Sequence, residues 1–402
     1  MLTHPNGPSM DTVAATLLAP DDQYNRELVD RVRPQSWRNP TPSGRYNLVV
    51  IGAGTAGLVS AVGAAGLGAK VAIVERHALG GDCLNYGCVP SKALIRAARA
   101  IAEARDGAAF GLVTGSVRPD FGAAMARLRR LRADIARNDS VARLASLGID
   151  VFFGQGRFVE VDAIEVEGTR VPFASAIVAT GARAAVPPIP GLAEAGFHTN
   201  ESIFSLTELP VRLVVIGAGP IGCELAQAFR RFGSEVTVIG DSDRLLPRED
   251  ADASQLIGDA FEREGVKMVL QARVTKVDRR SDAATRTVTV EQGTRTMTIE
   301  AEAVLVATGR APNVEGLGLD RAGISSTKSG ITVNDRLRTS NPRVWAAGDV
   351  ASGYKFTHAA DAMARVALQN ALFLGRKKTS ALVIPWATYT DPEVAHVGMT
   401  AE

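Results

Sequence analysis

Two of the chain's three cysteines, Cys83 and Cys88, lie five positions apart in the segment GGDCLNYGCVPSK. No further pair of ligands follows at the spacing that zinc needs, so we expect no metal site here. Pro90 suits the first turn of a helix, which places Cys88 just before a helix N-terminus, where the dipole favours a thiolate. A disulfide would need a local distortion between Cys83 and Gly87, and the glycine permits one. The alternative is a buried pair of small apolar side chains.

A repeat supplies the elements that would position such a pair. The hexapeptide VVIGAG occurs at 49–54 and at 214–219, each time as an apolar run, a glycine turn, a helical segment and a second apolar run. Glycines at the GxGxxG spacing make the tight turn, admit a pyrophosphate and let the helix pack on the strand. We therefore predict two dinucleotide sites rather than two helix starts without a ligand. Their glycines are Gly52, Gly54 and Gly57, and Gly217, Gly219 and Gly222.

The end of the second apolar run should hold the adenosine ribose. In the first copy this position is Glu75, whose carboxylate suits a pair of hydroxyl groups. In the second copy it is Gly240, followed by Asp241, which would repel a 2′-phosphate. The second site is therefore expected to favour NADH over NADPH slightly, although Arg244 and Arg248 lie close by in the sequence.

Six motifs in order, GAGTAG, GGDCLNYGCVPSK, IVATGA, GAGPIG, VLVATGRAPN and WAAGDV, resemble the class I pyridine nucleotide-disulfide oxidoreductases. That family includes mercuric reductase, lipoamide dehydrogenase and glutathione reductase, and the likeness runs from about Tyr46 to the last residue. It implies an α/β fold with two Rossmann-like, three-layer dinucleotide-binding domains, the second inserted in the first. FAD would occupy the first domain and NAD(P)H the second.

The resemblance also implies a division of the chain. We expect an N-terminal arm at 1–45, the FAD-binding domain at 46–185 and 310–378, the NAD(P)-binding domain at 186–309, and the start of a dimerisation domain at 379–402. Relatives continue for about another hundred residues, to a His-Pro-Thr-x-x-Glu motif whose histidine serves the partner subunit as acid and base. This motif is not in the sequence, which suggests a chain truncated in its interface domain.

Roles follow from the resemblance by position. Cys88 would be the sulfur that contacts the flavin, and Cys83 the outer sulfur that meets the substrate. Lys92 and Glu224 match an ion pair near the flavin N5, the alternative being a surface lysine and an ordinary helix glutamate. The helix after Thr357 would direct its N-terminus at the flavin, with His358 close by but packing or capping rather than catalytic, and Cys223 is expected in the core. The remaining implied cofactor-binding positions are Gly81, Thr180, Gly181, Gly309, Gly348 and Asp349.

Composition limits the partners. A net charge of +2 and 5% aromatic residues argue against nucleic acid or an anionic membrane. The arginine-rich stretch from Arg127 to Arg143 is interpreted as the solvated face of an amphipathic helix, whose buried side would carry Leu128, Leu131, Ile135 and Leu144. Leu48 to Ala69 is long enough to span a bilayer, but its glycines favour a nucleotide site. Few cysteines and no visible signal peptide indicate a cytoplasmic protein.

The expected function is transfer of electrons from NAD(P)H through FAD and the Cys83–Cys88 disulfide to a small-molecule disulfide or a thiol-bound metal ion, as in mercuric reductase. The full-length form is expected to be a homodimer. Two alternatives stay open: a dihydrolipoyl dehydrogenase-like enzyme, and a catalytically incomplete FAD- and NAD-binding module. A diaphorase that bypasses the thiols is a weaker third.

Overall fold

The structure, a computed structural model, describes residues 17–113, 115–280, 284–373 and 375–399. Its contacts divide the chain into two compact units, each assembled from separate stretches. The first unit comprises the residues up to 88 together with 130–183 and 311–384, and the second comprises 89–129, 184–310 and the residues from 385 onward.

The crossings between the units fall at Arg183–Ala184 and Arg310–Ala311, close to the boundaries expected after residues 185 and 309. The units differ from the expected division at 89–129, which we had assigned to the FAD-binding domain and which belongs by its contacts to the second unit. The cause is a long helix, α5 (Cys88–Asp106), whose side chains form ion pairs within the second unit. The end of the expected segment 379–402 lies outside the described residues.

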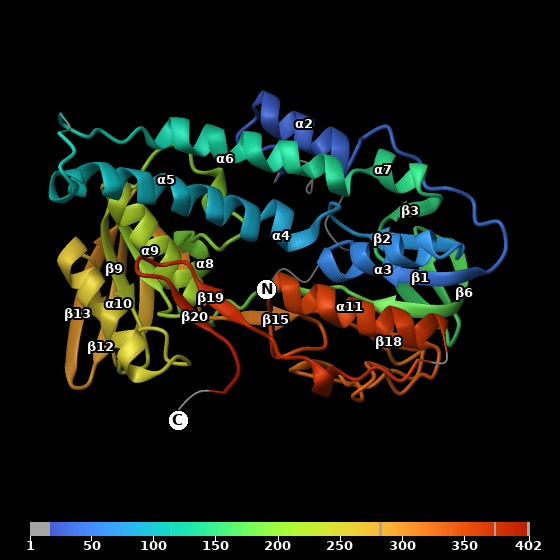
Figure 1. The fold of residues 1–402 in the computed structure, drawn as a ribbon. Helices are drawn as coiled ribbons and strands as arrows, with labels where there is room; N and C mark the ends of the chain where they lie inside the picture. Colours follow the sequence, from blue (N-terminus) through green and yellow to red (C-terminus); the bar gives the residue numbers. More distant parts are fainter. Residues whose placement is uncertain (1–16, 114, 281–283, 374, 400–402) are drawn as a thin grey trace. The chain divides into compact units, whose positions relative to one another are not determined.

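The first unit is built around one sheet in the order β3-β2-β1-β6-β5-β4, with β18 paired to β6. The strands β3, β2, β1, β6 and β18 run parallel, and their nearly continuous apolar sequences suit strands buried on both faces. Helices α3 and α11 pack against each other (Figure 1). Gly63 of α3 leaves the space that the Leu368 side chain of α11 fills. The elements of this unit are α2 (Gln23–Val32), β1 (Tyr46–Ile51), α3 (Thr55–Gly66), β2 (Val71–Glu75), α4 (Gly81–Asn85), η2 (Ala136–Asp139), α7 (Val141–Ser146), β3 (Ile149–Phe153), β4 (Arg157–Glu160), β5 (Ala163–Val166), β6 (Thr169–Val178), β16 (Ser326–Thr327), β17 (Gly330–Ile331), β18 (Val344–Ala346), α11 (Thr357–Leu372) and η4 (Thr379–Ala381), while β7 (Ala182–Ala184) and β15 (Arg310–Pro312) carry the crossings.

The N-terminal arm is tied to the open edge of this sheet. The Trp37 indole N–H donates to the carbonyl of Val151 at 3.1 Å. The Asn39 side chain both donates to the carbonyl of Phe153 and accepts from its N–H, at 2.8 Å each. The arm contains helix α2, and residues 1–16 of the arm lie outside the described part. The arm therefore covers β3, the edge strand of the sheet.

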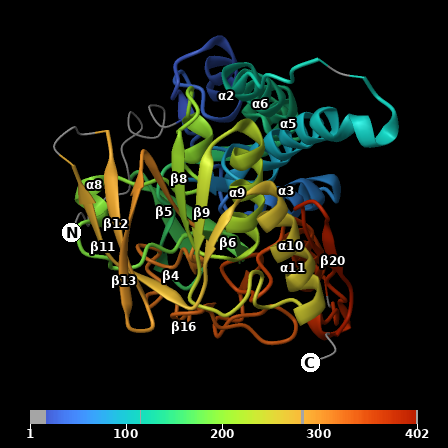
Figure 2. The same ribbon diagram turned by 90° about the vertical axis from the view of Figure 1, so that its left-hand side faces the viewer.

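The second unit repeats the same topology on a smaller scale. Its parallel sheet has the order β10-β9-β8-β14, and a three-stranded antiparallel sheet, β11-β12-β13, forms the ribbon visible in Figure 2. Two helices cross between the units: α5 (Cys88–Asp106) belongs to the second unit from Val89 onward, and α6 (Phe121–Ile135) belongs to the second unit up to Arg129 and to the first from Arg130. The other elements are η1 (Gly107–Phe110), α8 (Leu192–Ala195), η3 (Ile203–Ser205), β8 (Arg212–Ile216), α9 (Pro220–Phe232), β9 (Glu235–Ile239), α10 (Ala251–Glu264), β10 (Lys267–Val269), β11 (Ala272–Arg279), β12 (Arg286–Gln292), β13 (Arg295–Ala301), β14 (Ala303–Val306), β19 (Trp386–Thr388) and β20 (Val394–His396). The α/β fold class with two Rossmann-like units is confirmed.

The interpretation of the arginine-rich stretch as one solvated helix was wrong, although Leu128 and Leu144 are buried as expected. Helix α6 ends at Ile135, whose side chain is 40% exposed, and α7 begins only at Val141. Arg132 is buried instead of solvated, because its guanidinium donates to the carbonyl of Asn85 at 2.8 Å and to Oδ1 of Asn25 at 2.6 Å. Arg132 thus anchors the end of α4, which a count of charges alone could not reveal.

The apolar run at 48–69 forms β1, the glycine turn and α3. Among the described residues, no helix combines the length and the apolar character that a membrane crossing would require.

Candidate functional site: a thiol pair and two glycine turns

The two cysteines lie on either side of a break between helices. Cys83 is on α4, which ends at Asn85, and Cys88 is the first residue of α5, whose first turn contains Pro90. The backbone of Gly87 has no positive φ, but a Cβ there would lie 3.0 Å from the carbonyl oxygen of Asp82. The predicted distortion is present, and it needs glycine for close approach rather than for an unusual dihedral angle.

Both cysteines are thiols in this structure, and Thr357 completes the cluster. The Cys88 sulfur lies 3.0 Å from the hydroxyl oxygen of Thr357, the first residue of α11. The hydrogen bond with Cys88, and then burial, raise the pKa of the Cys83 thiol well above its usual range. When one proton leaves the pair, the negative charge is therefore favoured on Cys88, at the N-terminus of α5, with Cys83 as the donor.

The first glycine turn follows β1 at the carboxyl end of the parallel strands. Gly52 has φ +102°, and a Cβ there would lie 2.3 Å from the carbonyl oxygen of Ala179. A Cβ on Gly57 would lie 1.8 Å from the carbonyl oxygen of Gly52, and one on Gly81 would lie 2.5 Å from Cα of Gly54. No side chain caps the N-terminus of α3 at Gly54. The turn thus has the narrow backbone and the uncapped helix N-terminus that a pyrophosphate needs.

Glu75 ends β2 beside this turn, and it is buried. One carboxylate oxygen accepts from the N–H of Ala53 and the other from the N–H of His77, both at 2.7 Å. Burial raises the pKa of this carboxyl group, while the two backbone hydrogen bonds act in the opposite direction. Each oxygen of a carboxylate has a further lone pair, which suits the two hydroxyl groups of a ribose.

The loop after β18 closes the same edge of the sheet. A Cβ on Gly348 would lie 3.2 Å from Cβ of Ala56 on α3 and 3.5 Å from Cβ of Ala360 on α11, so this loop rests against the first turns of both helices. Asp349 follows at a half-buried position. The expected N-terminus of a helix at Thr357 is confirmed as the start of α11. These features fit an FAD in the first unit.

Thr180 and Gly181, expected at the cofactor, also fasten the chain where it leaves the unit. The Thr180 hydroxyl donates to the carbonyl of Asn313 at 2.7 Å, and the Asn313 side chain donates to the carbonyl of Thr180 at 2.9 Å. The N–H of Asn313 donates to the carbonyl of Gly181 at 3.0 Å. The outgoing and returning segments of the chain are therefore joined by three hydrogen bonds within the first unit.

The second glycine turn has the geometry of the first. Gly217 has φ +117°, and a Cβ there would lie 2.4 Å from the carbonyl oxygen of Ala307; a Cβ on Gly222 would lie 2.0 Å from the carbonyl oxygen of Gly217. Gly219 begins α9 without a capping side chain, and a Cβ there would meet nothing within 4 Å. Gly309, at φ +129°, follows β14. The second unit thus also fits a dinucleotide.

Strand register shows which residues of the two units correspond. Ile51 of β1 is opposite Val74 of β2, and Ile216 of β8 is opposite Ile239 of β9. The residue after Val74 is Glu75 and the residue after Ile239 is Gly240, as the sequence alignment of the two copies predicted. Asp241 follows with an exposed side chain.

Lys92 and Glu224 form an ion pair in the second unit. The Nζ atom of Lys92 lies 3.2 Å from Oε2 of Glu224, with the glutamate side chain 8% exposed and the lysine side chain 40% exposed. The other carboxylate oxygen of Glu224 accepts from the N–H of Tyr389 at 2.9 Å, and Lys92 Nζ lies 4.4 Å from the centre of the Tyr389 ring. The sequence predicted the pair but not Tyr389, which lies far along the chain without any local motif.

Two further expectations concern single residues. Cys223 is fully buried on α9, its sulfur bonds to the carbonyl of Ala218, and burial raises its pKa to about 12, which confirms a core position. The His358 ring stacks on Phe356 at 5.6 Å between centroids, which confirms packing. The roles of the other site residues stay predictions.

Comparison with known proteins places the chain in a family. Residues 46–364 match the pyridine nucleotide-disulphide oxidoreductases. Mercuric reductase from Staphylococcus aureus is 36% identical over 360 residues, which are 89% of this chain and 65% of that protein. Dihydrolipoyl dehydrogenase from Mycobacterium tuberculosis is 38% identical over 371 residues, 89% of this chain and 78% of that protein.

A solved structure supports the same relationship. The HOCl-induced flavoprotein disulfide reductase RclA from Escherichia coli superposes with a TM-score of 0.78 at 31% identity, covering 89% of this chain and 78% of that one. The chain spans less than two thirds of the length of the mercuric reductases from Staphylococcus aureus and Bacillus cereus, 65% and 61%. The chain belongs to the pyridine nucleotide-disulphide oxidoreductase family, whose members use FAD and NAD(P)H.

Proposed function

We propose that this protein transfers electrons from NAD(P)H, through FAD and the Cys83–Cys88 pair, to a small-molecule disulfide or a thiol-bound metal ion. The observation that carries the proposal is the thiol cluster: Cys88 begins a helix, lies 3.0 Å from Thr357, and is paired with a Cys83 thiol of raised pKa. Such an asymmetric pair separates the roles of the two sulfurs, which a structural pair of cysteines would not need.

When bound, FAD would accept a hydride from NAD(P)H and pass two electrons to the disulfide. The Cys83–Cys88 bond then breaks, Cys88 retains the negative charge as a thiolate, and Cys83 takes up a proton. Cys83 would then attack a substrate disulfide and form a mixed disulfide, while the first substrate thiolate leaves and takes up the proton of Cys83. Attack by the Cys88 thiolate on Cys83 would restore the Cys83–Cys88 disulfide and release the second substrate thiolate, which takes up a proton from solvent. Thiolates at both positions would instead hold a soft metal ion.

The chain's other residues would bind and orient the cofactors. The turn at Gly52, Gly54 and Gly57, with Gly81, would admit the FAD pyrophosphate, and Glu75 would hold its ribose. Gly348 and Asp349 would contact its central chain, and Thr180 and Gly181 its edge. The turn at Gly217, Gly219 and Gly222, with Gly309, would admit NAD(P)H, where the exposed Asp241 favours NADH.

The ion pair of Lys92 and Glu224 would act beside the flavin. Lys92 lies one helical turn after Cys88 on the continuous helix α5, so the two side chains project from the same face. A cation at this position would stabilise the negative charge that a reduced flavin carries.

The test is anaerobic addition of NADH to the FAD-loaded protein, with absorbance recorded during the titration. If the thiol pair is redox-active, the protein should accept four electrons, two at the flavin and two at the disulfide. A long-wavelength absorbance band should also appear, and Cys88→Ala should remove it. A titration that ends at two electrons in the wild type and is unchanged in Cys88→Ala contradicts it. Activity that survives Cys83→Ser would indicate a diaphorase.

The substrate is proposed to be Hg(II) bound to thiols, because the mercuric reductases are similar over 89% of this chain. The second candidate is dihydrolipoamide chemistry, favoured by 38% identity to dihydrolipoyl dehydrogenase. Parallel assays of NADH oxidation with Hg(II), lipoamide and glutathione disulfide separate the two.

We further propose that the full-length form is a cytoplasmic homodimer. Support comes from Val397 and Met399, apolar side chains that are 71% and 96% exposed and would be covered by a second subunit. Light scattering after size-exclusion chromatography tests the dimer, and cell fractionation tests the location.

A further inference from the structure

The buried carboxylate of Glu224 has one partner for each oxygen, and the two partners come from different segments. Lys92 of α5 pairs with Oε2, and the N–H of Tyr389, directly after β19, donates to Oε1. A carboxylate that is 8% exposed must keep such partners, because an unpaired buried charge is costly. The Tyr389 N–H therefore fixes the orientation of the carboxylate, so that its other oxygen faces Lys92.

The aromatic ring of Tyr389 acts on the other member of the pair. Lys92 keeps 40% of its side chain exposed, and an ion pair this open to solvent holds a long side chain only weakly. The ring lies 4.4 Å from Nζ, within range of a cation–π attraction. Tyr389 is itself 40% exposed, so packing in the core does not require an aromatic side chain there.

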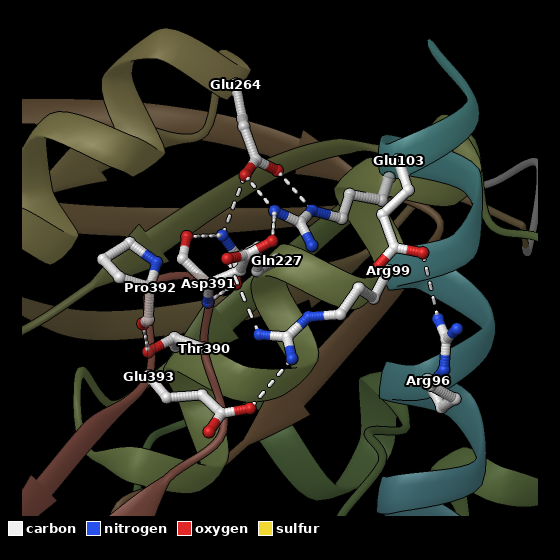
Figure 3. A network of polar contacts seen from close by, with 10 residues as sticks. Arg96, Arg99, Glu103, Gln227, Glu264, Thr390, Asp391, Pro392 and Glu393 are labelled. Carbon is white, nitrogen blue, oxygen red and sulfur yellow. Dashed lines mark hydrogen bonds and ion pairs between the residues drawn. The ribbon is translucent and has the colours of Figure 1, made fainter. Parts of the chain in front are cut away.

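The segment that carries Tyr389 is held on the two helices that carry the ion pair (Figure 3). Gln227 of α9 accepts from the N–H of Asp391 at 2.8 Å and donates to its carbonyl at 2.9 Å. Asp391 also pairs with Arg231 of α9 at 3.0 Å, and Arg99 of α5 bonds to Glu393 at 2.9 Å. Arg231 is further braced by Glu264 of α10 at 2.9 Å.

The spacing of these contacts follows the helices. Arg99 is seven residues after Lys92 on α5, and Arg231 is seven residues after Glu224 on α9, so each arginine lies two turns along the same face. The segment 389–393 therefore lies along both α5 and α9. Side chains of these two helices hold the segment in place.

From these contacts we infer that Tyr389 is a positioning residue: its N–H orients Glu224 and its ring holds the Lys92 ammonium in place. The inference rests on the proposed function, in which the Lys92–Glu224 pair acts beside the flavin. Its consequence is that the 389–393 segment influences the rate of hydride transfer through the Lys92–Glu224 pair.

The experiment compares Tyr389→Leu with Tyr389→Phe in the FAD-loaded protein, by stopped-flow measurement of flavin reduction at saturating NADH. Leucine keeps the backbone N–H but removes the ring, and we expect about a tenfold slower limiting rate with an unchanged KM for NADH. Phenylalanine keeps the ring and should remain within about twofold of the wild type. Equal rates for Tyr389→Leu and the wild type would overturn the inference.

A double-mutant cycle separates positioning from a general loss of structure. In a Lys92→Met background, Tyr389→Leu should produce no further decrease, because the ring then has no ammonium to hold. A tenfold decrease that persists in this background contradicts the inference. If Lys92→Met alone leaves flavin reduction unchanged, the proposed role of the ion pair fails, whereas a slow Lys92→Met with a normal Tyr389→Leu overturns only the role of Tyr389.

Two surface arginines of α5 provide a test that does not depend on the folding of Tyr389→Leu. Arg99→Met removes the contacts with Asp391 and Glu393 and should slow flavin reduction about threefold. Arg96→Met is the matched control, since Arg96 pairs only with the exposed Glu103 among its described ion-pair contacts, at 3.4 Å. Equal rates for the two arginine variants would count against the inference.

Discussion

The two VVIGAG turns have the same sequence and nearly the same backbone, but their surroundings differ. Gly52 and Gly217 both adopt a positive φ. The backbone of each lies so close to the carbonyl group that follows the neighbouring strand that a Cβ would overlap the carbonyl oxygen. After the second strand, however, the first unit has a buried Glu75 with both oxygens engaged, and the second has Gly240 and an exposed Asp241. The turn admits a pyrophosphate, and the residues after the second strand distinguish one nucleotide from another.

The largest effect is expected at the first glycine of each turn. Gly52→Ala and Gly217→Ala place a Cβ at 2.3 Å and 2.4 Å from a carbonyl oxygen, on backbones with positive φ. Each should cost about 3 kcal/mol or more in unfolding free energy. Gly52→Ala should lose FAD, whereas Gly217→Ala should keep FAD and lose NADH binding.

FAD absorbance after desalting and a titration with NADH measure the two outcomes. Gly66→Ala is the control, because a Cβ there meets nothing within 4 Å. Loss of FAD in both glycine variants would show that the turns do not serve separate nucleotides.

The next effect concerns the carboxylate that only the first unit has. Glu75→Gln leaves one of two backbone N–H donors facing an amide NH₂ group, so we expect FAD affinity to decrease about a hundredfold, or roughly 2.7 kcal/mol. Asp241→Asn, at the exposed position of the second unit, should change NADH affinity less than about threefold. Fluorescence titration of the apoprotein with FAD, and of the holoprotein with NADH, compares them. Similar losses in both would remove the distinction.

A smaller effect separates the two units by pH. His77 lies two residues after Glu75, and burial lowers the pKa of this histidine to about 4. Ser242 stands at the corresponding position of the second unit, two residues after Gly240. The unfolded histidine, with a pKa near 6.5, binds a proton that the folded one rejects, so stability is lost as the pH falls between about 6.5 and 4.

At pH 5 the buried, neutral His77 should lower the free energy of unfolding by about 1 to 2 kcal/mol. Urea unfolding at pH 7.5 and pH 5, of the wild type and His77→Gln, measures it as the difference between the two losses. Ser242→Ala should show no such difference, and parallel losses in wild type and His77→Gln would contradict the assignment.

The smallest effect is expected at Gly219. A Cβ there meets nothing within 4 Å, so Gly219→Ala should leave the free energy of unfolding within about 0.5 kcal/mol of the wild type. The methyl group would nevertheless stand where a pyrophosphate approaches the backbone, and KM for NADH should rise about threefold. Thermal unfolding and initial rates measure both quantities. A changed melting temperature with an unchanged KM would show that Gly219 serves the fold alone.

Much of this architecture was predictable from the sequence because it rests on local chemistry. Gly52 and Gly217 indicate tight turns, because their backbone conformation and close neighbours leave no room for a side chain. Pro90 marks the first turn of α5. The partnership of Lys92 with Glu224 was predictable only through resemblance, since the two residues lie 132 positions apart.

What could not be predicted depends on contacts between distant segments. In the sequence, Arg132 resembles the surface arginines around it. Only the fold brings Asn25 and Asn85 close enough to accept hydrogen bonds from its guanidinium group. Tyr389 gains its place from ion pairs two helical turns away from the residues it contacts. The units defined by contacts depend on such distant pairs as well: α5 begins in the first unit and forms its ion pairs in the second, so these units and the expected domains differ at 89–129.

The hydrogen bonds of the N-terminal arm have one more consequence. A parallel sheet that ends at β3 presents a row of unmatched amide and carbonyl groups, a template on which a strand from another molecule could assemble. The side chains of Trp37 and Asn39 form hydrogen bonds with the backbone of β3 at this edge. Because these bonds come from side chains and not from a strand backbone, no further strand can pair with the arm in the same way. The arm thereby guards the protein against sheet-to-sheet aggregation.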